Sequence, residues 1–516
     1  MCSSDLVNIT GNIIGAVSGA GNIQVTLGST TAASNGIFGI SHASGYASTI
    51  SGNVIGAVAA GNSAANASNI YGIAKLGVPA PLNIENNQVS GLQASSASTG
   101  NNQVVYGIAY EIAGGNAVIS GNTIQGLSNL TTGAGGQVHG IHSFTQGNQI
   151  INNAVSGLST TSPNISSNID ASVIGIAAHF RAAGQQISGN TIFGLSNSSS
   201  ARSKAIGIFF DGSQDINNRI SENFIHSLSV ATVDAGPLFG EIYGIRGNFG
   251  GGTFSNNIIS LGTGVSSNAY IYGIYDPGNA GSNYNLYHNT IYISGTSSGS
   301  LNNSYAFFSG NNANQKNIRN NIFHNARTYS GSLAHHNAVH YQSNAAGVNS
   351  DYNLYFHTGE FARMGPPDPP VFIPTLADWQ ALYPAQDAHS IVANSNFAVP
   401  GGTAAANYIP GNPYNGFNNT GILTDYNGTD RDCAFTRGAF EAAAGAVTAV
   451  FDPATSTRCQ GEETITYTAT VFNAVTIVYS IDNGLTINPA TGAVSYPAGW
   501  AGVATITVTA TGCDGT

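Results

Sequence analysis

Four side chains able to take part in catalysis lie in the middle of the chain, His179, Arg181, Asp211 and Arg246, and of these His179 and Asp211 occupy corresponding positions of successive repeats. Cleavage of a polysaccharide by elimination needs a basic residue together with carboxylates that hold Ca²⁺, and hydrolysis needs two carboxylates at a defined separation. On neighbouring strands His179 and Asp211 would have backbones about 5 Å apart, so their side chains could form a hydrogen bond. Glu111 would lie about 14 Å from Asp211, which is too far for a carboxylate pair. No catalytic residue is therefore assigned, and the four remain candidates beside the alternative of scattered surface polar groups.

A second set of residues recurs once per repeat and could bind a sugar: Phe209, Arg246, Tyr275, Phe308 and His340. At the spacing of neighbouring strands they would form an outward-facing strip about 19 Å long. Sugar rings stack on aromatic faces with interleaved polar groups, so the strip predicts a polysaccharide or surface-glycan site. Alanine substitutions there should weaken binding without preventing folding. The alternative is that outward rings simply pack beneath neighbouring loops.

The elements that position these residues come from a repeat marked by asparagine. In the stretch 119–128 (ISGNTIQGLS), two β-type runs flank Gly121-Asn122, a pair that tolerates positive φ and allows a sharp corner. Self-similarity at one period is typical of a solenoid, and the asparagines would stack as a ladder along one corner. The markers follow one another at intervals of 31 to 41 residues: Asn12, Asn53, Asn87, Asn122, Asn153, Asn190, Asn223, Asn257, Asn289, Asn321 and Asn353.

A second landmark, a small residue followed by an apolar one, runs in phase with the first, as in YGI at 106–108. The apolar residue, for example Ile141 or Ile176, should face inward, and the residue after it should face outward. The runs are too short and too rich in Ile, Val and Tyr for helices. Three short strands per coil predict an all-β fold, a parallel β-helix of about eleven coils.

With these repeats the chain resembles the right-handed parallel β-helix proteins of the pectin-lyase-like superfamily, in particular the large secreted surface proteins of Bacteroidota. Residues 350–356 (SDYNLYF) and 375–397 resemble the phrases that close such β-helices. Residues 424–441 resemble their terminal signature, with Thr436-Arg437 in place of Asp-Ile. The resemblance implies an extracellular or cell-surface protein, but it assigns no activity, because β-helices serve lyases, hydrolases and adhesins alike.

We expect four segments along the chain. A β-helix at 7–360 is followed by its C-terminal cap at 361–441, a linker at 442–449 and an antiparallel β-sandwich at 450–516 that resembles a PKD-like, immunoglobulin-type module. Within the cap, Leu376–Tyr383 should form a short helix with Thr375 as its N-cap. We also expect the chain to be part of a longer protein, because MCSSDLVNIT lacks a secretory signal and the last module is truncated.

The chain has four cysteines, and their positions indicate in which cellular compartment the protein resides. Cys459 and Cys513 lie in the small module, and we expect them to pair, which suits an oxidising, extracytoplasmic environment. The alternative is two free thiols. Cys433 has no evident partner, and Cys2 lies in the first few residues. No cysteine or histidine spacing predicts a metal site, and no cofactor is expected.

The composition excludes several classes of partner. A net charge of −11 with only 13 Lys and Arg leaves no basic stripe for nucleic acid. The sequence contains no run of about 18 apolar residues, so it predicts no membrane-spanning helix. Charged residues make up 7% of the chain, so uncharged polar residues must cover the surface.

Three functions are consistent with these features. The first is a secreted, cell-surface β-helix protein that binds glycans or acts as an adhesin. The second is a carbohydrate-active enzyme, a polysaccharide lyase or glycoside hydrolase, that uses His179, Arg181, Asp211 and Arg246. The third is a purely structural spacer. Depolymerisation of acidic or neutral polysaccharides by the purified protein would contradict the first.

The inward row can be tested by mutation. Replacing Ile176 by Asp should abolish folding, because a buried unpaired charge costs several kcal/mol. Circular dichroism and thermal melting would follow the loss of structure. A soluble, cooperatively melting Ile176→Asp protein would show that this row does not face inward.

Overall fold

The computed structural model of the chain describes residues 7–511 apart from several short segments. These residues form two units, one of Met1–Asn412 with Arg437–Phe440 and one of Pro413–Thr436 with Glu441–Thr516. All four cysteines, including Cys459 and Cys513, and most of the expected linker 442–449 lie outside the described residues. The segments left out are 17–22, 27–34, 63–67, 97–102, 215–216, 234–238, 280, 298–301, 311–313, 330–333, 343–346, 366–370, 413, 432–434, 442–446, 452–454, 459–460, 462, 473 and 475.

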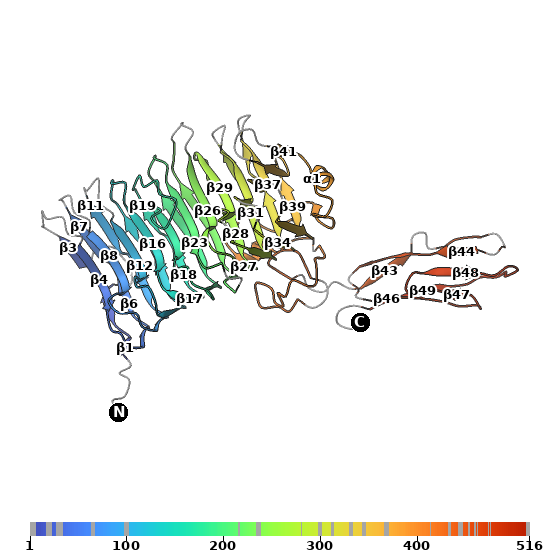
Figure 1. The fold of residues 1–516 in the computed structure, drawn as a ribbon, viewed down its shortest axis with the longest axis horizontal. Coiled ribbons are helices and arrows are strands. Elements are labelled where there is room, and N and C mark those ends of the chain that lie inside the picture. The colour runs from blue at the N-terminus through green and yellow to red at the C-terminus, as the bar shows by residue number, and fades with distance from the viewer. Residues whose placement is uncertain are drawn as a thin grey trace, which may run out of the picture. The chain divides into compact units, whose positions relative to one another are not determined.

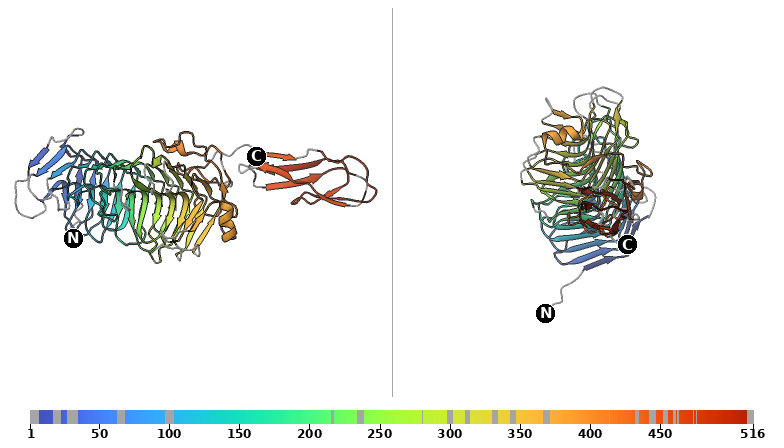
Figure 2. Two further views of the ribbon diagram at one scale, coloured as in Figure 1. Left: turned by 90° about the horizontal axis from the view of Figure 1, so that it is seen from above. Right: turned by 90° about the vertical axis from the view of Figure 1, so that its right-hand side faces the viewer.

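The first unit is a parallel β-solenoid of about ten turns, which confirms the all-β fold (Figure 1). Strands stack coil upon coil in three long sheets, and the left view of Figure 2 shows the stacked coils. An eleven-stranded sheet holds the strands that precede the asparagine corners. It contains β1 (Val7–Thr10), β5 (Ser48–Ser51), β9 (Leu82–Glu85), β13 (Asn116–Ser120), β17 (Gln146–Ile151), β21 (Gln186–Ser188), β24 (Arg219–Ser221), β27 (Gly252–Ser255), β30 (Tyr284–Tyr287), β34 (Lys316–Arg319) and β38 (Val348–Asp351).

A seventeen-stranded sheet follows the corners. In several coils a glycine with positive φ, such as Gly126 or Gly157, divides its contribution into two short strands. It contains β2 (Ile13–Gly15), β3 (Ile23–Thr26), β6 (Val54–Gly56), β7 (Val58–Asn62), β10 (Gln88–Ser90), β11 (Gln93–Ser96), β14 (Thr123–Gln125), β15 (Ser128–Asn129), β18 (Ala154–Ser156), β19 (Ser159–Thr160), β22 (Thr191–Asn197), β25 (Phe224–Val230), β28 (Ile258–Leu261), β31 (Thr290–Ile293), β35 (Ile322–Asn325), β39 (Leu354–His357) and β42 (Ile391–Val392).

A twelve-stranded sheet carries the YGI-type strands and both sets of candidate residues. The predicted inward row is confirmed, since Ile141 and Ile176 are fully buried in the main core. The sheet contains β4 (Asn35–His42), β8 (Ser68–Lys75), β12 (Val104–Tyr110), β16 (Gln137–Ser143), β20 (Val173–Ala178), β23 (Lys204–Asp211), β26 (Gly240–Phe249), β29 (Ala269–Asp276), β33 (Ser304–Ser309), β37 (His336–Tyr341), β40 (Ala362–Met364) and the antiparallel β41 (Val371–Ile373); a separate pair joins β32 (Thr296–Ser297) to β36 (Thr328–Tyr329).

The asparagine ladder is continuous from Asn12 to Asn353. At each step the side-chain Nδ2 donates to the Oδ1 of the next asparagine over 2.8–3.0 Å. The residue before each marker has positive φ, and where it is not glycine, as at Glu222 or His288, the coil imposes a conformation that L-residues rarely adopt.

The far end of the solenoid is capped. Helix α1 (Leu376–Leu382) has Thr375 as its N-cap, as predicted, and buries Trp379 against Tyr341 with ring centroids 5.3 Å apart. A short 3₁₀ helix, η1 (Ala405–Tyr408), follows. Arg437 returns to the corner and donates to the carbonyl of Asn353 over 2.9 Å, so its side chain binds the end of the ladder.

The second unit consists of small antiparallel sheets. The pairs are β43 (Thr448–Phe451) with β45 (Ala469–Phe472), β46 (Thr476–Ile481) with β49 (Ile506–Thr511), and the three-stranded set of β44 (Glu463–Thr466), β48 (Ala493–Tyr496) and β47 (Thr486–Ile487). The predicted antiparallel character of this module is therefore confirmed.

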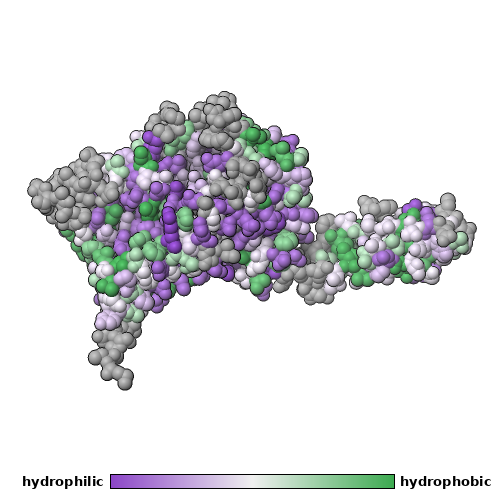
Figure 3. Space-filling model, viewed as in Figure 1, coloured by the Kyte–Doolittle hydropathy of each residue, from purple (hydrophilic) through white to green (hydrophobic). Residues whose placement is uncertain are grey.

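The surface of the solenoid is polar but carries little charge. Figure 3 shows hydrophilic residues over much of one face, with hydrophobic residues gathered in smaller patches. Because charged residues are only 7% of the chain, Asn, Ser, Thr and Gly provide most of this polarity.

Removing one rung should test the ladder. In Asn122→Ala, the buried backbone N–H of Asn87, which donates to the Asn122 Oδ1 over 2.9 Å, loses its acceptor. The carbonyl of Ile84 also loses its donor. We expect the free energy of unfolding to fall by about 2–4 kcal/mol in denaturant titrations. Gln125→Ala, at an exposed position of the same coil, is the matched control; equal stability of the two variants would contradict the role of the ladder.

Candidate functional site

The twelve-stranded sheet has two outward rows because the in-out alternation breaks at the landmark glycine. A Cβ added to Gly107 would lie 2.5 Å from Cγ2 of Ile124, so this position faces the interior. The next residue, Ile108, is also buried in the core. Two successive inward positions place the outward residues Tyr106 and Ala109 three apart in sequence, and the two rows lie side by side.

The predicted strip lies along the second outward row in the expected register. Phe209 pairs with Arg246, Arg246 with Tyr275, Tyr275 with Phe308, and Phe308 with His340. Exposure, however, is uneven. Tyr275 and Phe308 are half-buried, whereas Phe209, Arg246 and His340 are 1%, 7% and 5% exposed. The expectation that all these rings present open faces is therefore corrected.

The covering comes from tyrosines of the first outward row, which sequence reasoning overlooked as sugar-contacting candidates. Tyr272 packs edge-on against Tyr275 and Phe308, with ring centroids 5.1 and 5.5 Å away. Tyr243 and Tyr305 extend this cluster on either side. The tyrosine of each YGI triplet could have been noticed in the sequence. However, it lies two residues before the inward isoleucine, so strict alternation would have placed it on the inner face of the sheet and not beside the strip.

Burial also changes the expected result of truncation at the end of the strip. Phe209 is fully covered, so Phe209→Ala would leave a cavity and destabilise the solenoid by about 3–5 kcal/mol. Tyr275 and Phe308 stack on each other with centroids 4.9 Å apart and an interplanar angle of 11°. These two rings are the part of the strip that a ligand can reach.

Arg246 is held among aromatic rings. Its guanidinium carbon lies 5.7 Å from the ring centroid of Phe209 and 5.5 Å from those of Tyr243 and Tyr275. Its Nε and Nη1 atoms are buried without a hydrogen-bond partner. Cation–π contacts hold the charge in place, but they do not replace the hydrogen bonds of a guanidinium.

The carboxylates closest to Arg246 are engaged elsewhere. Glu241 accepts a hydrogen bond from the Tyr243 hydroxyl over 2.6 Å and pairs with Lys204. Asp211 pairs with Nε of Arg181 over 3.3 Å. Burial raises the pKa of Asp211 above its ordinary value, while the Arg181 charge acts in the opposite direction. Within the described part of the chain, no carboxylate forms a close ion pair with Arg246, although the Arg246 charge also acts to lower the pKa of Asp211.

The predicted hydrogen bond between His179 and Asp211 is not formed, because His179 contacts another histidine. Its Nε2 lies 2.8 Å from Nε2 of His142, whose Nδ1 lies 3.0 Å from Nδ1 of His139. Burial lowers the pKa of His179 to about 4 and that of His139 to about 3. The three imidazoles are therefore neutral at pH 7, and a chain of neutral rings can share hydrogen bonds without a counter-charge.

Glu111 lies beside this histidine chain, with its Oε2 atom 3.7 Å from Nε2 of His142. Burial raises the pKa of Glu111 to about 7. A carboxyl with such a pKa could donate or accept a proton. However, Glu111 directly follows β12 and Asp211 ends β23, and strands β16 and β20 lie between these two. The four catalytic candidates are therefore not assembled into one site. Arg181 pairs with Asp211, His179 belongs to the chain of histidines, and Arg246 is surrounded by aromatic rings.

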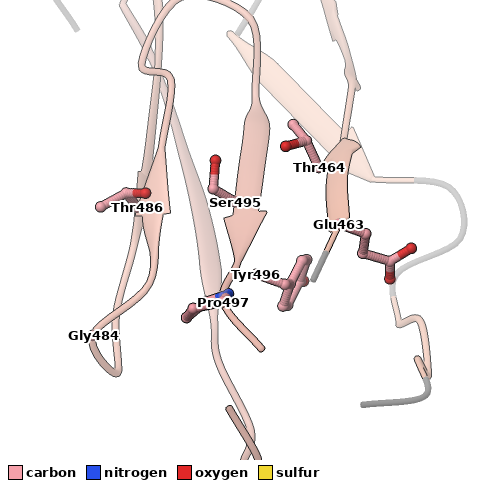
Figure 4. A pocket seen from close by; sticks show the side chains of 7 residues that line it. All are labelled: Glu463, Thr464, Gly484, Thr486, Ser495, Tyr496 and Pro497. Atoms are coloured by element: carbon pink, nitrogen blue, oxygen red, sulfur yellow. The ribbon is translucent and has the colours of Figure 1, made fainter. Parts of the chain in front are cut away.

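Other features of the described residues offer no competing site. No group of three His, Cys, Asp or Glu among them could hold a metal ion, and no described helix is long and apolar enough to cross a membrane. A pocket of about 380 Å³ in the second unit lies between β44, β47 and β48 (Figure 4). Glu463 is its only acidic lining residue, so it lacks a pair of carboxylates.

Comparison with known proteins adds no functional information. No family model matches the chain, and neither a curated protein nor a solved structure matches it.

The histidine chain predicts a pH dependence of stability. The pKa of His179 is lowered from 6.5 to about 4, so its contribution is present above about pH 6.5 and is lost as the pH falls towards 4. His179→Asn should reduce the stability lost between pH 6.5 and 4.5 by about 1–2 kcal/mol, as measured by denaturant titration at each pH. His389→Asn, whose side chain is 59% exposed, is the control. Parallel pH profiles for wild type and His179→Asn would contradict the assignment.

Proposed function

We propose that this solenoid is an extracellular, cell-surface binding protein whose ligand is an acidic glycan. The binding face comprises the half-buried rings of Tyr275 and Phe308 with the neighbouring guanidinium of Arg246. One observation carries the proposal, namely that Arg246 lies among three rings beside this stacked pair with no carboxylate in a close ion pair. Phe308 stacks on Tyr275 through one face and on His340 through the other, so the pair presents its ring edges outward. A ligand that packs a sugar ring against these edges and supplies a carboxylate to the guanidinium complements this arrangement.

The length of the half-buried ring pair and the charge of Arg246 restrict which glycans could bind. Tyr275 and Phe308 come from adjacent coils, so the reachable platform spans about 5 Å and suits one or two sugar rings. A uronic acid residue packed there could direct its carboxylate towards the 7% of Arg246 that remains exposed. The 19 Å strip expected from the sequence therefore becomes a shorter site.

Extracellular location and the finer family assignment belong to the same proposal. They rest on the resemblance of residues 350–356, 375–397 and 424–441 to pectin-lyase-like surface proteins, and of the small module to a PKD-like domain. The scarcity of charge is consistent with a repeat protein that covers its coils with Asn, Ser and Thr. The enzyme alternative is less well supported, because Asp211 is paired with Arg181 and lies three coils from Glu111, too far for a catalytic carboxylate pair.

The proposal predicts how binding responds to mutation. Tyr275→Ala and Phe308→Ala should each weaken binding of acidic oligosaccharides by about 0.5–1.5 kcal/mol beyond the lost contact area. Arg246→Met should abolish the preference for acidic over neutral oligosaccharides, and added salt should weaken wild-type binding. Calorimetry with oligogalacturonates of increasing length, beside neutral cello-oligosaccharides, would measure both effects.

The control is Ser41→Ala, an exposed position of the same row near its small-residue end. Thermal melting of each variant separates lost binding from lost folding. Equal binding by Tyr275→Ala, Phe308→Ala, Arg246→Met and Ser41→Ala would contradict the proposal and favour a structural spacer. Release of shortened oligosaccharides by the wild type would favour the enzyme.

A further inference from the structure

The interior of the solenoid becomes polar in its last coils, on the inner side of the sheet whose outer side carries the Arg246 face. The inward row two positions before the landmark glycine is apolar through Ile242 and Ile271. In the next coils this row continues as Ser304 and then His336, both fully buried. Nδ1 of His336 lies 2.9 Å from the Ser304 hydroxyl. A polar compartment therefore replaces hydrocarbon at this end of the core.

Arg327 extends into this compartment. Its side chain is fully buried, and its Nη1 donates over 3.1 Å to the carbonyl of Ala269, two coils earlier. Its Nε and Nη2 atoms are buried without a partner. Burial lowers the pKa of the guanidinium to about 10, and no acidic group offsets that shift. Arg327 is therefore still a cation at neutral pH.

No carboxylate neutralises this cation. Among the described residues of the surrounding coils, Asp276 pairs with Lys316, Glu360 with His335 and Asp351 with His389. Asp387 accepts hydrogen bonds from Trp379 and Ser390. The segments 298–301 and 330–333, which lie outside the described residues, both read SGSL and contain no acidic residue. An isolated buried cation costs several kcal/mol, so its charge needs a counter-ion from solution.

Further hydrogen-bonding groups line the same region. Asn302 belongs to the coil between Arg327 and Ala269, and the carbonyl of the next residue, Asn303, accepts from the N–H of Ile271 over 3.1 Å. Both amide atoms of Asn302 are buried without a partner. Nε2 of His336 is likewise buried with no side-chain partner, although the backbone of Thr328 forms a hydrogen bond with this imidazole. The guanidinium and the amide N–H₂ provide donors for a small anion, and Nε2–H of His336 adds one in the tautomer whose Nδ1 accepts from Ser304.

We propose that the last coils enclose a binding site for one small inorganic anion of chloride size, held by Arg327 with Asn302 and His336. The anion neutralises the buried guanidinium and connects three successive coils beneath the cap. Arg327, Asn302 and His336 are all buried, so a ligand as large as a carboxylated sugar could not reach them. This site is independent of the proposed glycan face.

Chloride should therefore stabilise the intact chain. At constant ionic strength, with gluconate replacing chloride, the midpoint of solenoid unfolding should rise by about 1–2 °C for each ten-fold increase in chloride above the dissociation constant. Arg327→Gln removes the charge and should abolish this rise. Arg219→Gln, at an exposed position of β24, should retain it and serves as the control for general salt effects.

A wild-type midpoint that does not respond to chloride would overturn the proposal, as would an unchanged response in Arg327→Gln. If Arg327→Gln fails to fold, wild-type crystals soaked in bromide decide the question. An anomalous peak within hydrogen-bond distance of the Arg327 guanidinium is expected. Its absence would mean that water alone fills the compartment.

Discussion

The structure depends on the hydrogen bonds that run from asparagine to asparagine along one corner. Each ladder side chain donates to the next rung, and most also donate to a backbone carbonyl on the far side of the corner, as Asn122 does to Ile84. Because the backbone N–H of each marker also binds the following Oδ1, the corner fixes the chain direction and the coil spacing together. Positive φ before each marker is tolerated even at Tyr352, since the ladder holds the turn.

The long sheets, and through them the candidate face, follow from this corner. With the coils in register, equivalent residues such as Tyr275 and Phe308 must lie next to each other. The rings that cover the outer face are therefore set by repetition. In the described strands, charged residues of the same sign do not recur at the same position of successive coils, so each charged side chain has surroundings of its own. Arg246 lies among aromatic rings on the outer face, whereas Arg327 lies inside the core.

Much of this could be read from the sequence, because repetition makes position predictable. The asparagine markers predicted the ladder, the YGI triplets predicted the inward isoleucines, and Thr375 predicted the start of α1. Burial along the strip could not be read in the same way. It depends on the break in alternation at glycines such as Gly244, whose added Cβ would lie 2.5 Å from Ile259, and this break brings Tyr243 over Arg246. Side-chain partners were also beyond the pattern, since His179 could reach either Asp211 or His142 and only the packing of the rings selects the latter.

Arg246 holds a cation with no close carboxylate beside the half-buried pair Tyr275 and Phe308, and a crystal structure of a ligand complex would show whether a sugar acid binds there. Crystals soaked with galacturonic acid should show the sugar ring against Tyr275 and Phe308, with its carboxylate hydrogen-bonded to Arg246. Density for the sugar at this place and in this orientation is the predicted result. An unoccupied face at saturating sugar, or a carboxylate directed away from Arg246, would contradict the account.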